Sequence, residues 1–275
     1  MLTLMLMASI SALAMNIYLP SLPQMALDFS TTPAAMGLSV GVYLGASAVI
    51  QLFAGPISDR IGRRKIVQFS LIVFVIASVS CAYAQRLETF LLYRAIQAVA
   101  ATCMIVSRAI VRDTTDTAGS GSRIAYVTMG MAVVPMFSPA LGGLIETHYG
   151  WQGTFFVLAS LGSIMLALSY FDQGETAPAS EHSILGQFQN YPLLLTSKRF
   201  WGYCLASAFG SGSFFAYLGG APAVGADVYA LDPQTVGLFL GAPAFGYFFG
   251  NFIAGRYSKS IGIDLMVLYG LSLAL

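Results

Sequence analysis

The stretch Gly55-Pro-Ile-Ser-Asp59-Arg60-Ile-Gly62-Arg63-Arg64-Lys65 joins two long apolar runs through a short charged segment. The runs on either side, residues 36–57 and 66–84, are each close to the roughly 20 residues that a helix needs to cross a bilayer. A charged loop between two segments of membrane length predicts a membrane protein whose polar loops connect spanning helices.

The composition of the whole chain supports this prediction. Apolar residues make up 57% of the 275 residues and charged residues 9%, whereas a soluble domain has roughly 45–50% and 25%. The net charge is +1 and the basic residues are scattered, so nucleic acid is not expected as a partner. Cys81, Cys103 and Cys204 lie in apolar stretches without a CxxC or histidine partner, so neither a disulfide nor a metal site is expected, and no cofactor is expected either.

Hydropathy predicts eight complete spans and the start of a ninth. The complete spans are residues 2–19, 36–57, 66–84, 89–106, 124–145, 154–171, 200–224 and 235–254, and the ninth apolar run is 263–275. Basic residues in the loops predict the orientation of these spans. Eleven of the thirteen fall on one side, which the positive-inside rule assigns to the cytoplasm together with the N-terminus.

A shift of 200 residues aligns residues 37–62 with residues 237–262 at eight identical positions. Because span two then matches span eight, we expect a repeat of six spans in the same orientation. On this interpretation residues 1–171 form an N-terminal half of six helices, 172–199 a cytoplasmic linker, and 200–275 an incomplete C-terminal half. The sequence analysis therefore interprets the chain as truncated; the alternative is a natural protein of eight spans with an interfacial tail.

The loop after span two resembles the G-x-x-x-D-R-x-G-R-R/K signature of the major facilitator superfamily. This resemblance implies the major facilitator fold, an all-α polytopic membrane protein. In the family, this loop latches the two halves in one conformational state, and we expect Arg60 to pair with a carboxylate near the end of span four. The residues that carry this latch motif here are Gly55, Asp59, Arg60, Gly62, Arg63 and Arg64, with Asp113 as the expected partner.

Other stretches resemble one branch of that family, the bicyclomycin and chloramphenicol resistance (Bcr/CflA-like) exporters. Asn16-Ile-Tyr18-Leu-Pro20-Ser-Leu-Pro23 is similar to the D-x-Y-L-P-x-x-P stretch of the branch, and Arg94-Ala-Ile-Gln97-Ala98 to the R-x-x-Q-G motif of the family. Span five resembles the antiporter motif G-P-x-x-G-G and implies exchange against protons. Its candidate residues are Gly130, Pro135, Pro139, Gly142 and Gly143, and the two prolines favour a bend in the helix.

Arg94 is the one charged side chain deep within a predicted span. An intramembrane charge costs roughly 2.5–3.5 kcal/mol unless it faces a partner or a polar cavity, so we interpret Arg94 as functional. All twelve acids lie in loops or at span ends, and position 16, where the branch carries Asp, holds Asn16. An amide cannot carry a proton. We therefore predict abnormal proton coupling, with Glu146 as a weak substitute.

The leading hypothesis is a monomeric carrier of a bacterial inner (cytoplasmic) membrane that exports small amphiphilic drugs, phenicol-like or bicyclomycin-like, by proton antiport and alternating access. Its expected partners are that substrate, protons and the lipid bilayer. The alternatives are a metabolite or sugar carrier of the same superfamily and a non-functional transporter fragment. An enzyme is not expected, because His148 and His182 both lie in loops. Candidate residues for coupling are Asn16, Tyr18, Arg94 and Gln97, and those for the substrate cavity are Tyr43, Phe214 and Tyr217.

Overall fold

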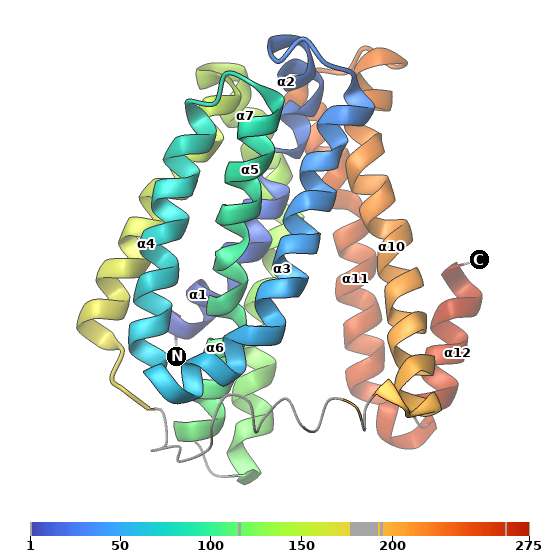
Figure 1. Cartoon of the computed structure of the whole chain (residues 1–275). Helices are drawn as coiled ribbons and strands as arrows, with labels where there is room; N and C mark the ends of the chain where they lie inside the picture. The colour runs from blue at the N-terminus through green and yellow to red at the C-terminus, as the bar shows by residue number, and fades with distance from the viewer. Residues whose placement is uncertain (1, 115–116, 177–191, 193–194, 262, 275) are drawn as a thin grey trace.

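The computed structural model describes residues 2–114, 117–176, 192, 195–261 and 263–274, and in these residues every regular element is a helix (Figure 1). The all-α fold predicted from the hydropathy pattern is therefore confirmed. The elements are α1 (Leu2–Asn16), η1 (Leu19–Ser21), α2 (Leu22–Asp28), α3 (Pro33–Ile61), α4 (Arg63–Ala82), α5 (Leu87–Gln97), η2 (Ala98–Ala100), α6 (Ala101–Thr114), α7 (Thr117–Asp172), α10 (Lys198–Asp227), α11 (Pro233–Ile261) and α12 (Ile263–Ala274), where η marks a short 3-10 segment.

Each of the eight predicted spans overlaps one of these helices or a run of consecutive ones. The long α7 contains two predicted spans, and its backbone leaves helical geometry at Gly150, with φ of 72°. The helix continues through Pro135 and Pro139. Within the described residues, five segments are long and apolar enough to cross a membrane: Leu2–Asp28, Pro33–Ile61, Arg63–Ala82, Leu87–Thr114 and Phe137–Asp172.

Local signals in the sequence explain where several helices begin. Thr32 accepts a hydrogen bond from the Ala35 amide at 3.2 Å and caps α3, whose first residue is Pro33. Asp232 caps α11 in the same way through the Thr235 amide at 2.8 Å. Each cap satisfies a backbone donor that a helix start leaves without a partner.

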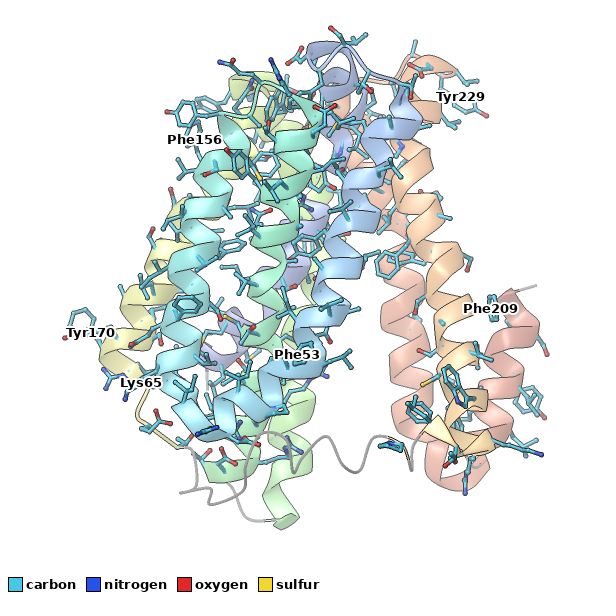
Figure 2. All side chains as sticks on the ribbon, in the orientation of Figure 1. Phe53, Lys65, Phe156, Tyr170, Phe209 and Tyr229 are labelled. Carbon is cyan, nitrogen blue, oxygen red and sulfur yellow. The ribbon has the colours of Figure 1, made fainter. Side chains whose placement is uncertain are left out.

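Two groups of helices lie side by side in Figure 1: the N-terminal bundle, α1 to α7, and the C-terminal helices, α10 to α12. We call the end with η1, α2 and the Gly150 turn the distal end, and the end with the Gly62 turn and Lys65 the basic end. The ribbons of the two groups lie close at the distal end and diverge toward the basic end (Figure 1). Lys65 and Tyr229 mark the two ends in Figure 2.

The two groups meet at the distal end through glycines. A Cβ on Gly143 of α7 would lie 2.2 Å from the carbonyl oxygen of Pro233, and a Cβ on Gly237 of α11 would lie 2.4 Å from that of Pro139. We call these two positions the glycine seam. Because no side chain stands between the backbones, α7 and α11 approach more closely than any larger residue would allow.

Candidate functional site

The Arg94 side chain lies at the centre of the N-terminal bundle and is completely buried. Its guanidinium carbon lies 4.3 Å from the ring centre of Tyr18, which follows α1, and 4.5 Å from that of Tyr43 on α3. Aromatic faces attract a cation by about 2 kcal/mol or more when water is excluded. The two rings therefore supply part of the stabilisation that the buried charge needs.

Hydrogen bonds connect Arg94 to two neighbouring helices. Nη1 donates to the carbonyl oxygen of Ala14 on α1 at 3.1 Å and to Oε1 of Gln97, one turn further along α5. The Gln97 amide donates in turn to the Ser78 hydroxyl of α4 at 2.7 Å. Nε and Nη2 of Arg94 are buried without a hydrogen-bond partner. The guanidinium thus retains unused donors aimed into the bundle.

The two tyrosines are themselves held in place by serine hydroxyls. The Tyr18 hydroxyl lies 2.9 Å from the hydroxyl of Ser39, and the Tyr43 hydroxyl lies 3.0 Å from that of Ser11. These contacts fix both rings against the cation. We call the set Tyr18, Tyr43, Ser78, Arg94 and Gln97 the Arg94 cluster. The sequence analysis did not include Ser11, Ser39 and Ser78 in the site. The signal that could have identified them is a small hydroxyl residue inside an apolar span.

Within the described residues no carboxylate forms an ion pair with Arg94. Asn16 is buried, yet its amide nitrogen donates to the Ala12 carbonyl of its own helix at 2.7 Å, and Oδ1 has no hydrogen-bond partner. The cluster therefore carries a net positive charge.

The other two predicted cavity residues come from the C-terminal helices. Phe214 and Tyr217 belong to α10, and the Tyr217 hydroxyl donates to the Phe239 carbonyl of α11 at 3.3 Å. No hydrogen bond or ring contact of the described residues joins either of them to the Arg94 cluster. Tyr43 lies inside the N-terminal bundle, and Phe214 packs against the hydrophobic core that includes Tyr18 and Tyr43.

At the basic end, Arg63 rather than Arg60 binds Asp113, which corrects the expected pairing. Arg63 Nε lies 3.1 Å from Asp113 Oδ2, and Nη1 contacts the Asp59 carboxylate. The cause is the turn at Gly62, where a φ of 110° ends α3 and starts α4 at Arg63. That turn leaves Arg60 exposed in the last turn of α3.

Glu175 also contacts this loop, although the sequence analysis did not single it out. Its Oε1 accepts a hydrogen bond from the Arg63 amide at 2.8 Å, and a Cβ on Gly62 would lie 2.4 Å from Oε2. A carboxylate at the start of a helix accepts a hydrogen bond from an amide that has no partner within the helix, and the helix dipole stabilises its negative charge.

Two further residues of the latch motif lie close to this turn or before it. Arg64 donates a hydrogen bond to the Tyr170 carbonyl at 2.6 Å. Gly55 lies within α3 and has open space around it.

The antiporter-motif glycines Gly142 and Gly143 lie at backbone crossings. A Cβ on Gly142 would lie 1.6 Å from the Ile17 carbonyl oxygen between α1 and η1, and Gly143 belongs to the glycine seam. Gly130 lies in the part of α7 whose side chains are outside the described residues. The described motif residues thus allow close helix packing at the distal end.

A cavity of about 290 Å³ lies at the distal end between the two groups of helices. Its walls include Pro23 and Gln24 of α2, Glu146 of α7, Asp227 of α10 and Val236 of α11. Glu146 is 9% exposed, and its Oε2 is buried without a hydrogen-bond partner. No group of three metal-binding side chains occurs among the described residues.

These observations define a polytopic α-helical membrane protein with a buried cationic cluster in its first helices. The family model of the Major Facilitator Superfamily matches residues 4–275, and the chain therefore belongs to this superfamily.

Among curated relatives, the uncharacterized MFS-type transporter YdgK of Bacillus subtilis is 32% identical over 262 residues, which is 93% of this chain and 65% of that protein. The multidrug resistance protein MdtL of Klebsiella pneumoniae is 36% identical over 166 residues, 60% of this chain and 42% of that protein. The chain thus spans less than two thirds of the length of both relatives.

Solved structures show the same fold. A bacterial homolog of the human lysosomal transporter Spinster, in an inward-facing conformation, superposes with a TM-score of 0.78 at 20% identity, over 95% of this chain and 62% of that one. A D-xylose-proton symporter superposes with a TM-score of 0.71 at 14% identity, over 94% and 68%.

Proposed function

We propose that this chain forms the N-terminal part of a transporter that exports small amphiphilic drugs from bacteria in exchange for protons. The observation that carries the proposal is the Arg94 cluster. A buried cation with unused donors, surrounded by two aromatic rings, is a polar site inside an otherwise apolar bundle. The similarity to MdtL, a multidrug resistance protein, supports drugs as the substrate class.

The proposed mechanism is alternating access between two halves, residues 1–171 and a C-terminal half that begins near residue 200, joined by the linker 172–199. Closure of the glycine seam seals the distal end while the basic end is open, and the reverse movement exposes the substrate at the distal end. In this proposal the membrane is the bacterial inner membrane, and the basic residues near Gly62 support a cytoplasmic location for the basic end and the N-terminus. The transporter acts as a monomer in the bilayer.

The motifs around Asn16 and Arg94 support assignment to the Bcr/CflA-like branch, and phenicol-like or bicyclomycin-like compounds are the proposed substrates. Arg94 takes part in coupling because it is a completely buried charge whose Nε and Nη2 have no hydrogen-bond partner. The latch residues Asp59, Arg63 and Asp113 stabilise the basic end in one of the two states.

The test is resistance in a bacterial strain that lacks its own drug exporters. Expression of the complete transporter to which this chain belongs raises the inhibitory concentration of chloramphenicol or bicyclomycin, an uncoupler abolishes the increase, and Arg94→Lys reduces it. Arg86→Lys, a change at an exposed arginine before α5, is the matched control. Equal resistance with and without Arg94, at equal amounts of protein in the membrane, would refute the role of the cluster. Absence of any resistance would refute drug export by this transporter.

A further inference from the structure

Glu146 differs from the other acidic residues of the chain in its surroundings. Among the acids whose side chains the structure describes, it is the one that is buried. It lies in the middle of α7, at the distal end of the molecule, four residues before the Gly150 turn. The function proposed above leaves this side chain without a role.

The cavity beside Glu146 exists only when the two groups of helices are together. One wall comes from η1, α2, α3 and α7 of the N-terminal bundle, and the other from α10 and α11. Separation of the groups at the distal end therefore exposes Glu146 to water, and their approach buries it. The exposure of the Glu146 carboxyl group to water therefore depends on the distance between the two halves at the distal end.

The surroundings of Glu146 hold no positive charge that could compensate a carboxylate. The cavity lining contains no Lys, Arg or His. The charged side chains that the neighbouring elements carry near the cavity are acids, whereas Lys198 and Arg199 of α10 and Arg60 of α3 lie at the opposite ends of their helices. Asp28 of α2 accepts a hydrogen bond from the Trp151 indole at 2.7 Å, Asp227 of α10 lines the same cavity, and Asp232 caps α11. On its own helix, His148 is exposed.

These conditions favour a neutral carboxyl group in the closed arrangement. Burial without a partner disfavours the charged form, and nearby acids disfavour it further. The hydroxyl of Ser21 is a polar neighbour of Glu146. It can donate a hydrogen bond to a carboxylate or accept one from a protonated carboxyl, so the preference for the neutral form comes from burial and from the nearby acids and not from Ser21.

We propose that Glu146 is a proton-binding site of the distal gate, which takes up a proton when the two halves close at that end and releases it when they open. The inference rests on the proposed alternating movement of the halves, and it adds a second point at which protons act, remote from the Arg94 cluster. A proton bound in the closed state and lost in the open state makes acid favour closure.

The expected size of the effect follows from one linked proton. The ratio of closed to open molecules rises by up to about tenfold for each unit by which the pH falls. Two exposed positions on opposite sides of the distal end, Tyr149 and Tyr229, suit a distance measurement. Spin labels are attached to Tyr149→Cys and Tyr229→Cys after Cys204→Ser; Cys81 and Cys103 are fully buried and stay in place.

The experiment records the distance distribution of this doubly labelled chain in lipid nanodiscs between about pH 5 and about pH 8. The short-distance population increases as the pH falls. Glu146→Gln, which keeps the size and removes the titration, stays in the short-distance state throughout. Glu88→Gln, at an exposed acid near the start of α5, keeps the pH dependence of the labelled parent.

Two results would overturn the proposal: a parent distribution that does not change with pH, or a pH dependence that persists unchanged in Glu146→Gln. Either result leaves the drug-resistance test untouched. Conversely, a pH-dependent distance that Glu146→Gln abolishes supports the gate even if no drug is exported, so failure of the proposed function and failure of this inference are distinguishable.

Discussion

The Cα of Gly143 faces the carbonyl oxygen of Pro233 so closely that a methyl group in place of the hydrogen would lie 2.2 Å from that oxygen. The contact joins the antiporter-motif helix to the start of α11. It gives Gly143 a steric role that spacing in the sequence does not reveal, because the second backbone comes from a position 90 residues further along the chain.

The first prediction concerns this contact. Gly143→Ala forces the backbones of α7 and α11 apart at the distal end, since overpacking of this kind costs about 1–3 kcal/mol. That cost shifts a two-state equilibrium by roughly 5- to 150-fold toward the open arrangement. The distance between labels at positions 149 and 229 therefore increases. Gly41→Ala is the matched control, because a Cβ there meets nothing within 4 Å. Identical distances in both variants would show that the seam does not hold the gate closed.

A second prediction separates stability from function in the Arg94 cluster. Arg94→Met together with Gln97→Leu removes the buried charge and its main hydrogen-bond partner. Replacement of a buried ionic group by apolar residues of similar volume is neutral or stabilising by about 1–4 kcal/mol. The double variant therefore melts at the same or a higher temperature in detergent, while transport is lost.

Arg94→Met alone gains less stability, because Gln97 Oε1 loses its donor. A double variant that melts well below the parent would mean that the cluster is primarily structural. Retention of drug resistance in the double variant would exclude Arg94 from coupling.

A third prediction concerns Asn16, whose Oδ1 is buried without a partner. Asn16→Asp places a group that can carry a proton on α1, close to the helix turn whose Ala14 carbonyl binds Arg94. Uncoupler-sensitive drug efflux should then increase. Asn16→Ala removes the amide without adding an acid and provides the control. An efflux rate equal to that of the parent would rule out Asn16 as the limit on coupling.

A fourth prediction distinguishes two arginines of the basic end. Arg63→Ala removes the partner of both Asp59 and Asp113, and hydrogen bonds to charged groups contribute about 1.5–3 kcal/mol each. We expect a clear fall in the thermal midpoint of unfolding. Arg60→Ala, at an exposed position, should change stability by no more than about 0.5 kcal/mol. Equal losses in the two variants would contradict the observed pairing.

The helical fold was predictable because a single apolar segment that crosses a bilayer must pair its own backbone hydrogen-bond groups, and a helix does this. The buried charge at Arg94 was predictable for the same reason, since a cation inside a span stands out against its neighbours. Tyr18, Tyr43 and Gln97 were named as candidates together with Arg94, but the packing of the two rings against the guanidinium depends on the relative rotation of α1, α3 and α5, which a sequence does not contain.

The pairing of Arg63 with Asp113 depends on the backbone angle φ at Gly62, and the residue types of the motif do not determine that angle. Glu175 lies more than a hundred residues away from the amide that it binds, so no local pattern could connect the two. The described structure corrected the sequence analysis at points where three-dimensional proximity, rather than hydropathy, decides the contact.

The glycine seam separates two kinds of evolutionary change in this protein. Its contacts run from backbone to backbone, so the seam itself constrains Gly143 and Gly237 and not the side chains that face the space between the halves. A substitution elsewhere in the lining of that space leaves the seam contacts unchanged, whereas a substitution of Gly143 or Gly237 by any larger residue brings a side chain against a backbone.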